Sequence, residues 1–279
     1  MKPVDLDGLF DEKLAQYMEE NKGKYTEKQW ENIIPKLYKK FGDTYVAKIK
    51  ATPKEYYAKM TDGELTETFA AHLAQKVPVP DFLCSEIEER NCIDALLPLL
   101  REGDGETVSY ALNLIGADAR AFPDYFSIIT EEKFDEDIRD AAVEKLKENA
   151  DAALAAALAY YKEGRAKEYM LEILSRAKTR SEEIFHILLD EFLSDGSRVP
   201  MHASYLAAYG DERALPYLHK KIEDREIGFV EFQELKYAVE ALGGEYNEPR
   251  DFSDDRDYRT IEDASLKEGF GFEKELPKS

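Results

Sequence analysis

The stretch GDERALPYL, residues 210–218, has a close copy upstream in ADARAFPDYF, residues 117–126. The prolines of the two copies, Pro123 and Pro216, are separated by three steps of about 31 residues, a period found in arrays of helical repeats. The copies differ in several side chains but keep an acidic residue, an arginine and a proline at matching positions. The chain therefore repeats a unit of structure rather than one short motif.

A second shared pattern shows what the repeated unit contains. The segments VSYALNLIG (108–116) and LKYAVEALG (235–243) carry apolar residues at helical spacing and end in glycine, which suits the left-handed residue just past a helix. Asp118 and Asp211 come shortly after such a glycine and can accept the free N–H groups at the start of a new helix. Pro216 lies about one turn further on, where it is expected to kink the helix or loosen its first turn. The repeated phrase thus predicts the end of one helix and the start of the next.

These signals predict an all-α fold. From about residue 81 onward the apolar residues recur at helical spacing, and runs of β-branched residues typical of strands are missing. The segment 81–244 divides into units of about 27 to 34 residues, each of which is a helical hairpin too short to bury its own apolar face without neighbours. The expected units are 91–117, 118–149, 150–178, 179–210 and 211–244.

The two ends of the chain follow other patterns. Residues 1–80 lack the repeat and predict a helical cap, with a capped amphipathic helix that begins after Thr26, and further helix starts at Thr52 and at Thr61 or Asp62. VPVP (77–80) predicts a stiff extended joint between cap and array. Residues 245–279 are acidic and lack helical periodicity, but they predict a tail folded back along the last repeat because they contain the aromatic residues Phe252, Tyr258, Phe270 and Phe272.

GDERALPYL and the segment DEDIRDAAVEKL (135–146) resemble the HEAT-like repeats of phycobilin lyases and of many bacterial scaffold proteins. The resemblance covers about residues 91–244, and the alanine-rich unit 150–178 fits it least. It implies a right-handed α-α superhelix of about five HEAT-like hairpins, in which the second helix of each pair lines a concave surface. The matched positions are those of packing, caps and turns, so the resemblance concerns fold rather than chemistry.

The charge of the chain indicates the kind of partner. The formal net charge is −21, and residues 81–150 hold 18 acidic but only 7 basic side chains. Such a field opposes binding to nucleic acid and favours a protein partner with a basic surface, although acidic helix faces could equally serve only to keep the protein in solution. The candidate partner-binding residues are the acids that flank the second hairpin: Asp135, Glu136, Asp137, Asp140 and Glu144.

The sequence motifs of known enzymes and metal sites do not fit this chain. Deoxyhypusine hydroxylases of HEAT-like architecture bind iron through His-Glu pairs, whereas the four histidines here are followed by leucine, isoleucine, alanine and lysine. VDLDGLFDEKL (4–14) lacks the residues that a calcium loop needs at both ends, and helix capping explains it better. No glycine-rich phosphate loop or Gly-x-Ser-x-Gly elbow occurs in the sequence. We therefore assign no catalytic, cofactor-binding or metal-binding residue, and no cofactor.

Four side chains of reactive type have plain structural explanations. Cys84 and Cys92 lack companion ligands at zinc spacing and are expected to be inert, partly buried thiols. His186 and His202 lie in apolar helical segments and are expected to be core residues.

The sequence favours a non-catalytic protein-interaction scaffold or adaptor that binds its partner on the concave surface. The start of the chain is acidic where a signal peptide would be apolar, so we expect a cytoplasmic protein without membrane association. The alternative is a HEAT-like lyase or other enzyme that acts on a small molecule or a modified protein. An alkylpurine DNA glycosylase is less expected, because the acidic surface opposes DNA, and a structural array that joins partners through its ends stays open. The oligomeric state is not determined by these patterns.

Overall fold

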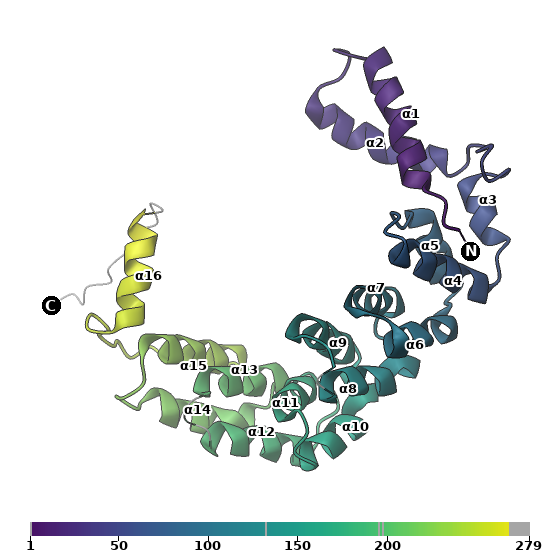
Figure 1. The fold of residues 1–279 in the computed structure, drawn as a ribbon. Helices are drawn as coiled ribbons and strands as arrows, with labels where there is room; N and C mark the ends of the chain where they lie inside the picture. Colours follow the sequence, from purple (N-terminus) through teal and green to yellow (C-terminus); the bar gives the residue numbers. More distant parts are fainter. Residues whose placement is uncertain (1, 132, 195, 197, 268–279) are drawn as a thin grey trace. The chain divides into compact units, whose positions relative to one another are not determined.

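The computed structural model describes residues 2–131, 133–194, 196 and 198–267 (Figure 1). These residues form sixteen α-helices and two 3₁₀ turns, and the one β-bridge among them joins Val46 to Ala51. The predicted all-α class is confirmed for this part of the chain. The chain divides into two compact units, residues 1–149 and 150–279, and the division coincides with the predicted boundary between the second and third hairpins.

The first unit begins with helices whose starts the sequence predicted. Thr26, Thr52 and Thr61 are the N-caps of α2, α3 and α4, and each forms a reciprocal capping box with the residue three positions later. Helix α4 packs against α5, α6 and α7, so helices on both sides of the extended segment 77–80 belong to one core. The helices of this unit are α1 (Leu6–Glu20), α2 (Glu27–Phe41), α3 (Pro53–Ala58), α4 (Asp62–Ala74), α5 (Asp81–Glu89), α6 (Ile93–Glu102), α7 (Gly105–Ile115), α8 (Phe122–Thr130) and α9 (Glu136–Glu148).

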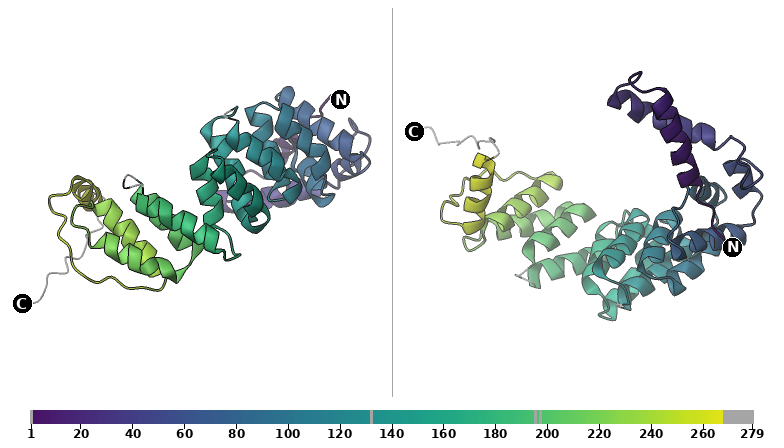
Figure 2. Two further views of the ribbon diagram at one scale, coloured as in Figure 1. Left: turned by 90° about the horizontal axis from the view of Figure 1, so that it is seen from below. Right: turned by 45° about the horizontal axis from the view of Figure 1, so that its top comes forward.

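The second unit is built from helix pairs. Helix α13 packs between α11 and α15, as Figures 1 and 2 show for the green part of the chain. Ala203 in α13 and Ala238 in α15 are fully buried, which is the small-residue packing expected where helices approach closely. The helices are α10 (Ala150–Lys162), α11 (Lys167–Ser175), α12 (Glu182–Ser194), α13 (Val199–Tyr209), α14 (Leu215–Ile222), α15 (Phe229–Ala241) and α16 (Arg256–Lys267).

Each of the five predicted hairpin segments contains two helices that pack on one another. The pairs are α6 with α7, α8 with α9, α10 with α11, α12 with α13, and α14 with α15. Gly116 and Gly210 follow α7 and α13 with φ angles of +62° and +72°, a backbone conformation that favours glycine. The predicted helix stops are therefore confirmed at these two positions.

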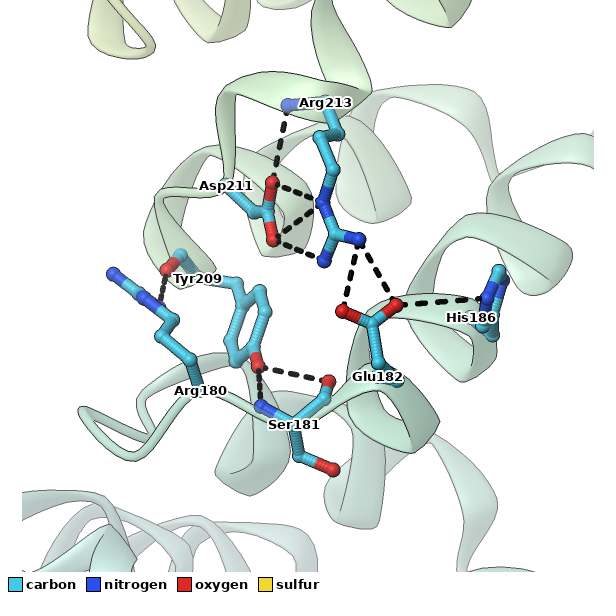
Figure 3. Close-up of polar contacts among 7 residues, drawn as sticks. All are labelled: Arg180, Ser181, Glu182, His186, Tyr209, Asp211 and Arg213. Atoms are coloured by element: carbon cyan, nitrogen blue, oxygen red, sulfur yellow. Dashed lines mark hydrogen bonds and ion pairs between the residues drawn. The ribbon is translucent and has the colours of Figure 1, made fainter.

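The repeated phrase forms the same polar junction in both units. In Figure 3, Asp211 accepts a hydrogen bond from the backbone N–H of Arg213 and is also paired with its guanidinium group. The same guanidinium donates to both carboxylate oxygens of Glu182 at 2.9 Å, which ties the junction to the preceding hairpin. The upstream copy repeats this arrangement with Asp118, Arg120 and Asp94. The arginine therefore fastens each copy to the helix pair before it.

The prolines of the two copies determine how the next helix begins. The residues before Pro216 form a 3₁₀ turn, Glu212–Ala214, and the α-helix begins only at Leu215. Ala119–Ala121 forms the same turn before Pro123. The expected loosening of the first turn is confirmed.

The segment after Gly244 contains a helix, so the expectation that it lacks helical structure is wrong for residues 256–267. Helix α16 packs against the end of α15 (Figure 1). Phe252 contacts the ring of Phe232, and Tyr258 contacts that of Phe229. Sequence analysis missed this helix because the segment has few apolar residues and is polar overall, although its residues do follow a helical period. Two of the predicted tail aromatics, Phe270 and Phe272, lie outside the described residues.

Candidate functional site

The five acids that the sequence singled out lie at the start and along the surface of α9. All five are exposed, and Asp137, Asp140 and Glu144 share one face of the helix. Asp135 is the N-cap of α9, where its side chain accepts the N–H of Ile138. Glu144 is paired with Lys147 at 2.6 Å. Two of the five acids thus stabilise their own helix, and whether the set binds a partner stays a prediction.

A large groove in the first unit lies elsewhere, between α1, α2, α3 and α5, which occupy the purple and blue part of Figure 1. We call it the acidic groove. Its volume of about 1050 Å³ is at the upper end of the range for ligand sites, so it has room for several side chains of a bound chain. It is lined by Asp7, Phe10, Asp11, Ile34, Pro35, Tyr38, Lys39, Lys54, Glu55, Ala58, Asp81, Phe82, Ser85, Glu86 and Glu89.

One wall of the acidic groove is aromatic. The rings of Tyr38 and Phe82 are stacked, with centroids 4.7 Å apart and planes inclined by 12°. Phe10 meets the Tyr38 ring edge-on at 5.0 Å, and Phe41 fills the space behind Phe10 and Phe82. These contacts join α1, α2 and α5, so the wall is held by the same aromatic cluster that attaches the first two helices to the rest of the unit.

A polar chain fixes Asp7 at this wall. The hydroxyl of Tyr38 donates a hydrogen bond of 2.7 Å to Asp7 Oδ1, and the backbone N–H of Asp81 donates to the same hydroxyl at 3.3 Å. Partial burial raises the pKa of Asp7, the hydrogen bond from Tyr38 lowers it, and the charges of Asp81, Asp5 and Asp11 raise it further. The net effect is a raised pKa, because negative charge is concentrated where water is partly excluded.

The acids of the groove outnumber its cations. Six carboxylates and two lysines line it. Lys54 is paired with Asp43, which lies outside the lining. Within the part of the chain that the structure describes, no lysine, arginine or histidine nitrogen lies within 4.0 Å of the carboxylates of Asp7, Asp11, Asp81 or Glu89. The groove therefore holds negative charge that the described chain does not neutralise.

A buried hydroxyl lies close to the same site. Tyr57 in α3 is fully buried, and its hydroxyl has no hydrogen-bond partner in the described chain. Burial raises its pKa, and the charges of Tyr56 and then Asp7 raise it further, which places it within electrostatic range of Asp7.

Sequence analysis missed this site because its acids come from separate elements. Asp7 and Asp11 lie one turn apart on α1, and Asp81 begins α5 directly after Pro80. One signal was available in the sequence: the segment 27–41 has a large apolar face. In the structure only one side chain of this helix, Phe41, is buried. An apolar face that stays partly uncovered indicates a surface for another molecule.

The other side chains of reactive type do not form a centre. His186 is exposed, with 64% of its side chain accessible, so the expectation that it is a core residue is wrong; it lies on the outer face of α12 beside Glu182. His202 is buried as expected, with 1% exposure. Cys84 and Cys92 are free thiols, and burial is the largest cause that raises the pKa of each to about 11. In the described residues no three His, Cys, Asp or Glu side chains are arranged to hold a metal ion.

None of the described helices has both the length and the apolar character needed to cross a lipid bilayer. No family model, no curated protein and no solved structure matches this chain.

Proposed function

We propose that this protein is a non-catalytic interaction module whose acidic groove binds a basic segment of a protein partner. The observation that carries the proposal is the concentration of carboxylates without cation partners beside an aromatic wall. Charge complementarity speeds the encounter with a basic segment, and the apolar wall supplies contact area that a purely polar surface lacks. A partner that brings cations also relieves the repulsion among Asp7, Asp11 and Asp81.

We propose further that the five helix pairs form a right-handed HEAT-like superhelix that presents the α9 acids to partners. Two features support it: the pairs begin and end at the predicted boundaries, and the Asp-Arg junction of Figure 3 recurs with the same geometry upstream. Small-angle X-ray scattering tests the shape. A compact chain of this length has a radius of gyration of about 19 Å, so a value near that would contradict an extended array.

Binding of a fluorescein-labelled nine-residue peptide rich in arginine and lysine tests the function. Anisotropy titrations of the full chain at about 50 and about 300 mM salt should show binding that weakens with salt, because exposed charge pairs are screened. The double variant Asp11→Asn, Glu89→Gln removes two exposed groove charges and should weaken binding about tenfold, from about 0.2–1 kcal/mol per exposed pair.

A matched variant separates the groove from overall charge. Asp137→Asn with Asp140→Asn removes the same charge from α9 and should change affinity less than about twofold. A larger effect of the α9 variant would move the binding site to the acids that the sequence predicted. Absence of binding at low salt would overturn the proposed function.

A further inference from the structure

The groove presents more than negative charge, because its carboxylates stand beside a flat aromatic surface. Tyr38 and Phe82 are stacked face to face as two parallel layers, which we call the plate, and Asp7 is attached to the edge of the Tyr38 ring through its hydroxyl. Asp81 lies at the same edge, since its backbone N–H donates to that hydroxyl. The Tyr38 hydroxyl therefore positions the carboxylate of Asp7 and holds the backbone of Asp81 beside it.

These carboxylates still have capacity to accept hydrogen bonds. Oδ2 of Asp7 and both side-chain oxygens of Asp81 have no hydrogen-bond donor in the described chain. The charges of Asp81 and Asp11 both contribute to the raised pKa of Asp7, so each lies within electrostatic range of its carboxylate. A single cation placed beside Asp7 would interact with all three.

The spacing of the acids argues against a metal ion as that cation. A bound Ca²⁺ or Mg²⁺ requires several oxygens that converge within about 2.0–2.6 Å of one point. No such group of three acidic side chains exists in the described chain. A larger organic cation with several hydrogen-bond donors is a better match, because its donors can reach carboxylates that do not converge on one point.

We propose that the acidic groove recognises arginine, whose guanidinium group lies against the Tyr38–Phe82 plate and donates hydrogen bonds to Asp7 and Asp81. The proposal rests on the function proposed above and names the side chain that anchors the partner. A guanidinium group is planar, weakly hydrated and carries five donors in a fixed fork, so it can stack on an aromatic ring and reach two carboxylates together.

Lysine matches the same groove less well. Its ammonium group is a compact, strongly hydrated point charge that loses more hydration against an aromatic surface and has no plane to stack. The structure thus predicts a preference between two cations of equal charge. Charge attraction alone would not produce that preference.

Three labelled peptides that differ at one central position test the preference for arginine on the unmodified full chain. They carry arginine, lysine or citrulline at one central position, and citrulline keeps the shape of arginine without its charge. We expect the arginine peptide to bind at least about tenfold more tightly than the lysine peptide, and the citrulline peptide to bind most weakly. Equal affinity for the arginine and lysine peptides would overturn the arginine proposal and leave the basic-segment function standing. Failure of all three to bind would overturn both.

Variants of the plate locate the preference. Phe82→Leu removes the ring that is stacked on Tyr38, so the arginine-to-lysine affinity ratio should fall toward one while the lysine affinity changes little. Tyr45→Leu changes an exposed aromatic residue of the same unit outside the groove and should leave the ratio unchanged. Because Phe82 is largely buried, Tyr38→Phe serves as a second variant: it keeps the ring, frees Asp7, and should lower affinity for arginine more than for lysine. An unchanged ratio in both Phe82→Leu and Tyr38→Phe would refute the assignment to this plate.

Discussion

Replacement of Asp7 by asparagine should stabilise the first unit at neutral pH and weaken binding of an arginine peptide. The pKa of Asp7 is raised in the folded chain above its ordinary value of 3.8, chiefly by burial, so its ionised form is disfavoured there. The folded state then binds the proton more tightly than the unfolded state, and the stability that Asp7 contributes is lost as pH rises through its folded pKa. Asparagine removes the charge but keeps an oxygen that can accept the Tyr38 hydrogen bond.

The size of the effect follows from opposing contributions. Removing the charge of Asp7 relieves its desolvation, which is the largest cause of the raised pKa, and the repulsion from nearby acids. For an illustrative separation of about 6 Å, one like charge costs about 0.7–2.8 kcal/mol at effective dielectric constants of about 80 to 20. Asparagine is a neutral acceptor and forms a weaker hydrogen bond with Tyr38, which offsets the stabilisation by about 1 kcal/mol. Because Asp7 is only half-buried, solvent screening reduces the remainder, and we expect a net stabilisation of about 0.5 kcal/mol at pH 7. Loss of a charged acceptor for the guanidinium group should reduce affinity by about tenfold or more.

Trp30 makes the assay specific for the first unit. It is the one tryptophan of the chain, lies in α2, and packs edge-on against Tyr17 and Tyr25. Urea unfolding of the full chain, followed by its fluorescence at pH 7 and below pH 3.8, should show a gain for Asp7→Asn that disappears at the lower pH.

A charge control on the same helix completes the test. Glu12→Gln removes an exposed charge from α1 and should change stability by less than about 0.5 kcal/mol at either pH. If Asp7→Asn were less stable than the parent at pH 7, or if its gain did not depend on pH, the electrostatic reasoning for the groove would be refuted.

Three further predictions concern packing and thiol chemistry. Tyr209→Phe should destabilise the second unit by about 1–3 kcal/mol, because the buried Tyr209 hydroxyl accepts the N–H of Ser181 at 2.8 Å. Urea unfolding followed by circular dichroism measures the change, and Tyr217→Phe on the exposed surface should have little effect. Gly116→Ala should cost about 1–3 kcal/mol in thermal unfolding because of its positive φ angle, whereas Gly63→Ala, in open space within α4, should be neutral or stabilising by up to about 1 kcal/mol. Cys92, 3% exposed and with a pKa raised to about 11, should react with iodoacetamide at pH 8 far more slowly in the folded chain than in urea; equal rates would contradict its burial.

Local signals in the sequence account for most of the helix boundaries. Threonine caps, prolines in the first turn and glycines past helix ends act within four residues, so Thr26 and Gly210 have the same effect in any fold that forms those helices. The helix at 256–267 was missed because the segment contains few apolar residues, although its residues follow a helical period. His186 was misplaced because an apolar helical segment does not by itself show which face is covered.

The sequence by itself determined the all-α class, the helices of the five pairs and an excess of acidic side chains. Only the tertiary structure brought Asp7 and Asp81 to one aromatic plate, although they are far apart in the chain and belong to different helices. The physical reason is that helix formation depends on near neighbours, whereas a binding site depends on which helix faces remain uncovered after packing. That choice is made by the aromatic cluster of Phe10, Phe41 and Phe82, which joins α1, α2 and α5 and leaves their carboxylates around one groove.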